Sequence, residues 1–455
     1  MTTPSLFART ATRALLPAST LPLALTRALT RALTLALTVV TSTRPLLAQA
    51  TATRKEAVTA QGFSTARLAR IDSLLDRAAR DQQITGAVAL VLRDDRVVYE
   101  RAVGFADKEA GRRMSPNALF RIASQTKALT STAILMLLEE GRLTLGDPVS
   151  KYLPSFQRTQ VAVRTDTGVA LVAAKRAITV RDLLTHTAGI SYGTDASVAS
   201  RYQAKGLGPA AGNGWYTADK DEPVCETMER LGTLPFVAQP GEAFVYGYNT
   251  DILGCIVEKA SGMPLDVFLR DRIATPLGMS NTAFFVPTSA REQLAAVYMS
   301  DAKGKSVRAP DGARGQGHYI DGPRRNFAGG AGVVSTARDY ARFLQMILHG
   351  GEWNGQRLLA PHTVRLMHTN QIGTTYSANG MGFGLGFETT DRYGANGLAS
   401  PGSFGWGGAY GSTYLVDPAE GLIVVFMIQQ VPNSSDVAAR YRTLVYQALV
   451  TSRLK

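Results

Sequence analysis

The stretch S-Q-T-K at residues 124–127 opens a long apolar run, 128–138, which predicts a helix that ends at Gly141. Residues three apart share one face of a helix, so the Lys127 amine can reach the Ser124 hydroxyl within one turn. A serine at a helix N-terminus also lies near backbone N–H groups and the positive end of the helix dipole, which favour a developing oxyanion. Burial of Lys127 against the apolar run would favour the neutral amine that a general base needs.

The same four-residue pattern occurs a second time, from Ser300 to Lys303. That copy lies in the polar stretch 299–315, where nothing apolar would bury the lysine or hold the serine, so it is predicted to be a solvent-exposed loop. For the copy at Ser124, a helix-capping serine followed by a surface lysine is the structural alternative. Residues elsewhere in the chain have to decide between the two interpretations.

The first fifty of the 455 residues have the composition of a targeting segment. They contain five arginines, no acidic residue, an apolar stretch at 32–40 and the small-x-small sequence A-Q-A at 48–50. This pattern predicts a signal peptide, residues 1–50, for export to the periplasm or the cell exterior; a basic tail at the membrane surface is the alternative. Residues 51–64 are predicted to be a linker. No other segment is long and apolar enough to span a bilayer.

The net charge of the chain does not point to nucleic acid. Removing the five arginines of the predicted signal peptide lowers the formal charge from +13 to +8. The other basic residues are scattered, without a basic helix or interleaved aromatic residues. The charge is better explained by solubility and by attraction to anionic surfaces or substrates.

Cysteine and histidine usage argues against a disulfide framework and against a metal site. Two cysteines allow at most one bridge. Cys255 lies in the apolar run 252–257, where a buried unpaired thiol is the simpler interpretation; a bridge to Cys225 is the alternative. The five histidines are scattered and show no H-E-x-x-H or C-x-x-C spacing, so neither a metal ion nor another cofactor is expected.

Periodicity places strands and long helices at both ends of the chain. Amphipathic helices and strand hairpins are predicted at 65–80, 87–92 with 97–103, 336–349, 413–416 with 422–428, and 435–450. Hairpins rather than βαβ crossovers indicate an antiparallel sheet covered by helices, an α+β fold. The middle of the chain, 147–322, is loop-rich with helical segments at 180–184 and 251–259, and no sustained strand alternation is found there. A helical region is therefore predicted between the two halves of the sheet.

Two later segments could complete a site around a Ser–Lys pair. P-G-E-A-F-V-Y at 240–246 places Tyr246 just after a Pro-Gly turn, where its phenol could relay a proton. F-G-W-G-G-A-Y-G at 404–411 leads into a strand, and its glycines let the backbone approach a ligand and offer N–H groups to an oxyanion. Taken singly, a packed tyrosine and a bulge beside a core tryptophan would explain these segments equally well.

In this order, S-x-x-K, P-G-x-x-x-x-Y and W-G-G-A-Y-G resemble the serine β-lactamase and penicillin-binding superfamily, and most closely its class C-like branch with the family VIII carboxylesterases. The connecting segments 178–189 and 329–339 resemble that branch as well. The resemblance implies a β-lactamase/transpeptidase-like fold for a hydrolase domain at 65–455. It also implies an α/β part at about 65–146 and 323–455 and an all-helical part at about 147–322.

Carried over by position, the resemblance implies catalysis through an acyl-enzyme. Ser124 would be the nucleophile, Lys127 the base or proton shuttle, and Tyr246 the second proton-transfer group. The oxyanion would be bound by the backbone N–H groups of Ser124 and Ala409.

Two departures from the superfamily pattern favour esters over β-lactams. Trp406, Gly407 and Gly408 stand where the usual pattern is Lys-Thr-Gly, so the cation that would anchor a β-lactam carboxylate is absent. Lactamases commonly carry Tyr-x-Asn, whereas Asn249 comes one position late, which argues against an amide hydrogen bond to substrate. An uncharged acyl ester loses nothing by either change.

A competing nucleophile is Ser191, because G-I-S-Y-G at 189–193 fits the G-x-S-x-G elbow of α/β-hydrolases. The elbow requires a strand before the serine and a helix after it. Here 180–184 has a helical pattern and 194–200 has no apolar face. Ser191 is therefore predicted to lie in a loop near the domain junction, and His186 is predicted to be structural rather than a catalytic base.

The sequence thus predicts an exported serine hydrolase, a carboxylesterase whose partner is a small-molecule ester with a short acyl chain. One alternative keeps the same site but uses a β-lactam or a D-alanyl-D-alanine peptide. The other is a non-catalytic, penicillin-recognising protein that binds the cell wall. Neither a nucleic-acid partner nor a membrane span in the mature chain is expected.

Overall fold

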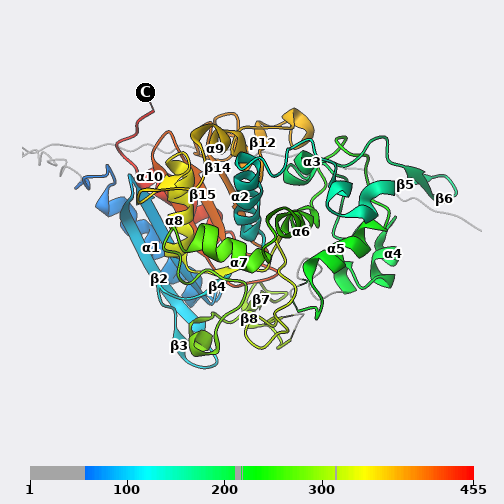
Figure 1. Cartoon of the computed structure of the whole chain (residues 1–455). Coiled ribbons are helices and arrows are strands. Elements are labelled where there is room, and N and C mark those ends of the chain that lie inside the picture. The colour runs from blue at the N-terminus through cyan, green and yellow to red at the C-terminus, as the bar shows by residue number, and fades with distance from the viewer. Residues whose placement is uncertain (1–56, 211–216, 218, 313–314, 455) are drawn as a thin grey trace, which may run out of the picture. The chain divides into compact units, whose positions relative to one another are not determined.

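Strands from the two ends of the chain meet in one eight-stranded antiparallel sheet of order β12-β13-β14-β15-β16-β1-β2-β3 (Figure 1). At its centre, β1 (Gly86–Arg93) pairs with β16 (Leu422–Met427). Each of these strands forms a hairpin with its neighbour in sequence, β2 (Arg96–Asp107) or β15 (Thr413–Asp417). The predicted antiparallel sheet is confirmed.

The structure is a computed structural model that describes residues 57–210, 217, 219–312 and 315–454. The predicted signal peptide and the beginning of the predicted linker lie outside the described residues. None of the helices in the described part has the length and apolar character needed to cross a bilayer. The other strands of the large sheet are β3 (Arg112–Arg113), β12 (Met381–Phe383), β13 (Glu388–Thr390) and β14 (Phe404–Gly407).

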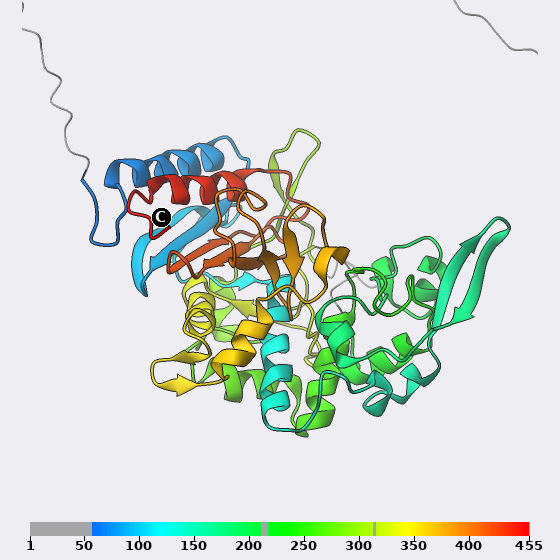
Figure 2. The same ribbon diagram turned by 90° about the horizontal axis from the view of Figure 1, so that it is seen from above.

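Alternate side chains of the central strands enter two separate cores. The odd-numbered side chains of β1 at 87–91 pack with α1 (Thr65–Arg80) and α10 (Val437–Ala448). These two helices lie side by side on one face of the sheet (Figure 2). The even-numbered side chains at 88–92 join the larger core on the other face. Because both faces of β1 are buried, its sequence is apolar almost throughout instead of alternating between apolar and polar residues.

The helix that begins after Ser124 lies inside the larger core. This helix, α2 (Thr126–Glu139), is buried from residue 126 to 137 and packs against α6 (Asn249–Ser261). Because it is surrounded by protein, it is apolar on all sides rather than amphipathic. By contrast, α8 (Ala337–Leu348) has one apolar face and packs against β1 and β16. Smaller elements complete this part of the fold: β4 (Phe120–Arg121), β9 (Val334–Ser335), β10 (Glu352–Trp353), β11 (Gln356–Arg357) and α9 (Pro361–Met367).

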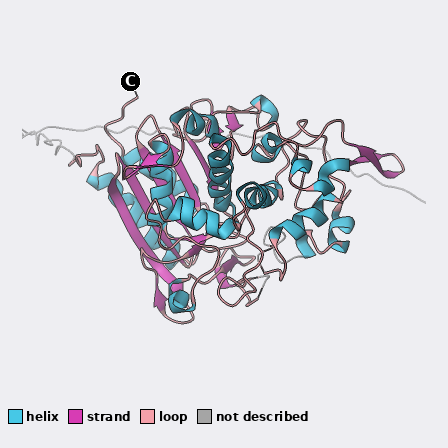
Figure 3. Cartoon of the chain, in the orientation of Figure 1, coloured by secondary structure: helices cyan, strands magenta, loops and turns pink. Residues whose placement is uncertain are grey.

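The middle of the chain is mainly helical, but the prediction that it is all-helical is wrong. Besides α6, its helices are α3 (Val180–Leu184), α4 (Ala199–Ala204), α5 (Val224–Gly232) and α7 (Leu265–Leu269). Its hairpins are β5 (Gln160–Thr165) with β6 (Gly168–Ala173) and β7 (Tyr298–Ser300) with β8 (Ser306–Arg308) (Figure 3). The β5–β6 hairpin projects outward and most of its side chains are exposed (Figure 2). A hairpin without a buried face has no apolar alternation to detect.

Cys225 and Cys255 form a disulfide that links α5 to α6. The simpler interpretation of Cys255 as a buried unpaired thiol is therefore wrong. The two helices pack against each other and bring the two Cα atoms within 5.0 Å. This distance suits a disulfide and depends on helix packing, so it could not be read from a separation of thirty residues.

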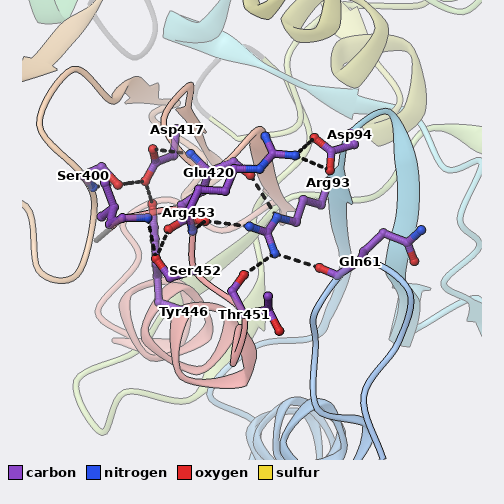
Figure 4. Close-up of polar contacts among 11 residues, drawn as sticks. Gln61, Arg93, Asp94, Ser400, Asp417, Glu420, Tyr446, Thr451, Ser452 and Arg453 are labelled. Atoms are coloured by element: carbon purple, nitrogen blue, oxygen red, sulfur yellow. Dashed lines mark hydrogen bonds and ion pairs between the residues drawn. The ribbon is translucent and has the colours of Figure 1, made fainter.

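A buried ion pair connects the centre of the sheet to both ends of the described chain (Figure 4). Arg93, the last residue of β1, lies 2.7 Å from Glu420 in the β15–β16 turn, and the two side chains are only 4% and 3% exposed. Nη1 of Arg93 also donates to the carbonyl oxygens of Gln61 and Thr451, each at 2.8 Å. One guanidinium therefore holds the segments before α1 and after α10 together.

Candidate active site

Ser124 lies in a short helical turn, η1 (Ala123–Gln125), between β4 and α2. The preceding residue, Ala123, has a φ of 43°, a left-handed conformation that residues other than glycine rarely adopt. The start of α2 is held by long-range contacts: the Tyr340 hydroxyl donates to the Gln125 carbonyl at 2.9 Å, and the Val333 N–H donates to Thr126 Oγ1 at 3.1 Å. The strained backbone and these anchors set the direction of the Ser124 side chain.

The Lys127 amine is buried next to Ser124. Its side chain is 2% exposed, and Nζ lies 3.4 Å from Ser124 Oγ, 2.9 Å from the Tyr192 hydroxyl and 2.7 Å from the Gly330 carbonyl oxygen. Burial raises the pKa of Tyr192 well above its usual value, and the nearby Tyr246 adds to this effect, so the Tyr192 phenol keeps its proton. The predicted Ser–Lys contact is present, and Tyr192 is a third member that the sequence analysis missed.

These contacts allow proton transfer from the serine. A protonated lysine has three N–H donors, and all three contacts of Lys127 are then donations. A neutral lysine has two N–H groups and one lone pair. Because the Gly330 carbonyl can only accept, the lone pair must face one of the two hydroxyls, Ser124 or Tyr192. In the first arrangement Lys127 can take the Ser124 proton as a general base.

A buried carboxyl contacts the same glycine, Gly330, whose carbonyl oxygen accepts from Lys127. Oδ1 of Asp251, in α6, accepts the Gly330 N–H at 3.0 Å, while Lys127 donates to the Gly330 carbonyl. Burial raises the pKa of Asp251 to about 6, although the charge of Lys127 opposes the shift. A Cβ at position 330 would lie 2.5 Å from Asp251 Oδ2, so only glycine fits between the two side chains. Asp251 was not singled out in the sequence, where it stands five residues after Tyr246.

The phenol ring of Tyr246 packs beside the Lys127 amine. Its ring centroid is 4.7 Å from Lys127 Nζ and 5.7 Å from the ring of Tyr192. The Trp406 indole N–H donates to the Tyr246 hydroxyl at 3.3 Å. The structure thus brings together five residues, Ser124, Lys127, Tyr192, Tyr246 and Trp406, which span 282 positions of the sequence.

A pocket of about 520 Å³ opens above these residues. Its lining residues are Ser124, Tyr192, Tyr246, Tyr376, Glu388, Trp406, Gly407 and Ala409. Of the sequence-predicted residues, Lys127 lies behind the lining and Gly408 lies beside it. A Cβ at Gly408 would be 2.5 Å from the Ile122 carbonyl oxygen, so this glycine lets the end of β14 approach the segment that carries Ser124. Tyr376 and Glu388 had no sequence signal.

The alternative serine lies in a different arrangement. Ser191 Oγ accepts the Gly193 N–H at 3.1 Å in a loop that follows α3 and not a strand. His186 Nδ1 lies 2.9 Å from the Asn249 amide nitrogen, and its ring packs 4.8 Å from that of Tyr246. Burial lowers the pKa of His186 well below its usual value, and the Lys127 charge lowers it further, so the imidazole stays neutral. These contacts fit a packing role for His186, and they turn the Asn249 amide away from the pocket lining.

The second S-x-x-K copy is built differently from the first. Ser300 is the last residue of β7 rather than part of a loop, and its Oγ accepts hydrogen bonds from the Gln430 amide at 2.7 Å and the Ser434 N–H at 3.1 Å. Lys303 is exposed in the turn of the hairpin. Lys303 is therefore exposed to solvent, whereas Lys127 is buried.

The sequence of the chain matches the model of a known protein family. The model of the β-lactamase family matches residues 71–448, which includes every strand of the large sheet and all of the residues above. The chain belongs to the β-lactamase family. The β-lactamase-like fold and the serine hydrolase class predicted from the sequence are thereby confirmed.

Individual relatives of this β-lactamase-family chain match along most of their length. Protein Rv1367c of Mycobacterium tuberculosis is 35% identical over 379 residues, which cover 78% of this chain and 88% of the relative. Esterase EstB of Burkholderia gladioli is 33% identical over 375 residues, covering 79% and 89%. Among solved structures, EstCE1, a hydrolase with promiscuous acyltransferase activity, has a TM-score of 0.70 at 25% identity, covering 85% of this chain and 99% of EstCE1.

Proposed function

We propose that the protein is an exported carboxylesterase that hydrolyses short-chain acyl esters through an acyl-enzyme at Ser124. The observation that carries the proposal is the meeting of the Ser124 hydroxyl, the Lys127 amine and the Tyr246 phenol at one pocket. The similarity to esterase EstB supports the choice of substrate class.

In the acylation step, Ser124 Oγ attacks the ester carbonyl carbon while Lys127 takes the hydroxyl proton. The tetrahedral oxyanion binds to the backbone N–H groups of Ser124 and Ala409. The bond between the carbonyl carbon and the alcohol oxygen then breaks, and the departing alkoxide receives a proton through Tyr246. Water attacks the acyl-enzyme, its proton returns through the same groups, and the carboxylic acid leaves as Ser124 regains its hydrogen.

The pocket suits an ester better than a β-lactam. No lysine or arginine is among its lining residues, and Trp406 occupies the edge where a β-lactam carboxylate would need a cation. Aromatic rings cover much of the wall, which favours small apolar groups near the scissile bond. An uncharged ester needs only the nucleophile, the proton carriers and the oxyanion donors.

Export is proposed from the N-terminal composition and the disulfide. Residues 1–50 would be removed as a signal peptide, and 65–455 would be the hydrolase domain. The predicted linker, 51–64, is packed into that domain over its last residues, because Gln61 accepts a hydrogen bond from Arg93 and Phe63 is buried in the core with α1 and α10. Disulfides persist in oxidising compartments, so the Cys225–Cys255 bridge supports a periplasmic or secreted location.

The test compares two serine variants on a p-nitrophenyl ester of a short acyl chain. Ser124→Ala should lower kcat/KM by about a thousandfold or more, because the covalent intermediate can no longer form. Ser191→Ala should retain most of the activity and serves as the matched control. A large loss only in Ser191→Ala would overturn the assignment of the nucleophile.

A second measurement addresses the substrate class. Nitrocefin and a D-alanyl-D-alanine peptide are assayed beside the aryl ester, and a fluorophosphonate adduct is mapped by peptide mass. Faster turnover of either competitor than of the ester would refute the carboxylesterase proposal. A labelled peptide that contains Ser124 supports it, whereas absence of any adduct would favour a non-catalytic protein.

A further inference from the structure

We propose that the pocket selects esters that carry a positive charge, a quaternary ammonium or a protonated amine, and that Glu388 is the group that recognises it. This inference rests on the proposed esterase function and names the substrate class of the same site. It is carried by the charge and the aromatic character of the pocket wall.

Glu388 is the one charged side chain among the eight residues that line the pocket. It lies in β13, directly opposite Gly405 of β14, so no cross-strand side chain covers it on that side. Across the described part of the chain, no lysine, arginine or histidine forms an ion pair with Glu388. Its negative charge is therefore left for a ligand.

One oxygen of this carboxylate is held in place and the other is open. The Tyr376 hydroxyl donates to Glu388 Oε1. Burial raises the pKa of Tyr376, and the hydrogen bond to Glu388 raises it further, so the phenol stays protonated and continues to donate. Oε2 accepts no hydrogen bond from any residue that the structure describes. Tyr376 thus orients the carboxylate, while Oε2 can face a bound cation.

Four of the other seven lining residues are aromatic. Tyr192, Tyr246, Tyr376 and Trp406 all line the pocket, and the ring centroids of Tyr246 and Trp406 are 5.5 Å apart. The face of an aromatic ring attracts cations, and quaternary ammonium groups are commonly bound by several such rings. A carboxylate beside four aromatic side chains therefore favours a cation and repels a substrate that carries its own carboxylate.

The nearby lysine does not reverse this preference. Lys127 lies behind the lining residues and is 2% exposed. Its amine contacts the Gly330 carbonyl and the Tyr192 hydroxyl, and its charge interacts with the buried Asp251 carboxyl. Glu388, which faces the open pocket, consequently sets the sign of the charge that a substrate meets.

The test uses two thioesters of nearly the same shape, acetylthiocholine and its uncharged analogue 3,3-dimethylbutyl thioacetate, with thiol release measured in both. The native protein should favour acetylthiocholine in kcat/KM by about tenfold, with the difference mainly in KM. The preference should fall as ionic strength rises, because the carboxylate is partly exposed to solvent. Equal kcat/KM for the two substrates would overturn the proposal.

Three variants separate recognition from a structural role. Glu388→Gln should bring the ratio of the two kcat/KM values close to one. Glu226→Gln, the same change on the exposed surface of α5, should leave the ratio as it is. Tyr376→Phe keeps the ring and the carboxylate, so it should retain the preference. If Glu388→Gln keeps the native preference for the cationic ester, Glu388 does not recognise the charge and the proposal is wrong.

An inhibition experiment needs no variant. Choline should inhibit hydrolysis of a neutral aryl ester by the native protein about tenfold better than 3,3-dimethylbutanol does. Equal inhibition by the two alcohols contradicts cation recognition. If the aryl ester is hydrolysed in a Ser124-dependent way without any preference for cations, only this inference fails. If no ester is hydrolysed, the proposed function itself fails.

Discussion

Replacing Glu420 with glutamine should destabilise the protein more than any single surface substitution. Glu420 is 3% exposed at its side chain and lies 2.7 Å from the guanidinium of Arg93, which is 4% exposed (Figure 4). The glutamine keeps the size of the side chain but removes its charge. The change therefore leaves a buried cation without its counter-charge, which is the costly way to break a buried ion pair.

The size of the loss in unfolding free energy depends on the hydrogen bonds that Arg93 still makes in the variant. Removal of one partner of a buried ion pair costs about 3–5 kcal/mol. Arg93 still donates to the carbonyl oxygens of Gln61, Thr451 and residue 420, so the loss should be near the lower end, about 3 kcal/mol. With the unfolding entropy expected of a chain of this length, that loss lowers Tm by about 3 °C.

The matched control is Asp94→Asn, which breaks the neighbouring pair between Asp94 and Arg453. Those side chains are 47% and 50% exposed, so the loss should be below about 1 kcal/mol, or about 1 °C. Differential scanning calorimetry at one pH measures both variants against the native protein. Equal shifts in the two variants, or a shift below about 1 °C for Glu420→Gln, would refute the argument that burial makes the Arg93 pair important.

Three further predictions concern the active site and the disulfide. Tyr192→Phe should lower kcat on an aryl ester by about tenfold, because the Lys127 amine loses a hydroxyl partner at 2.9 Å; an unchanged kcat would contradict a role for that contact. Burial raises the pKa of Asp251 to about 6, so the native protein binds this proton more tightly than the unfolded chain and should lose about 3 kcal/mol of stability as pH rises from about 4 through 6. In Asp251→Asn, melting curves across that range should lack this loss, and a parallel decline in both proteins would show that another group is responsible. Replacing Cys225 and Cys255 together with serine should cost about 3.5 kcal/mol, as expected for a loop of 30 residues, and denaturation with unchanged stability would argue that the bridge does not constrain the chain.

Much of the fold could be predicted because its signals are local. The helix at 65–80 was predicted with the bounds that the structure has, since the side chains that face the sheet recur with the period of a helix turn. The hairpins at both ends were predicted because each joins neighbouring strands through a short polar turn. The S-x-x-K spacing placed an amine beside a hydroxyl because both lie within one helical turn.

The site could be predicted only in part. Ser124, Tyr246 and Trp406 carried motifs, and all three line the pocket. Tyr192 stands in G-I-S-Y-G, a motif that points to its serine and not to its tyrosine, and Glu388 lies in no motif. Neither residue has a local pattern that links it to the nucleophile, because the contact is created when distant parts of the chain pack together.

The sequence by itself therefore determined the helices and hairpins predicted at the two ends of the chain and the serine–lysine pair, all of which depend on neighbours within about one turn or one hairpin. The tertiary structure alone decided that β1 pairs with β16, that Cys225 meets Cys255, and that a carboxylate and four aromatic rings surround Ser124. Such contacts join residues far apart along the chain, and their distances follow from how helices and sheet pack around a shared core rather than from any spacing along the backbone.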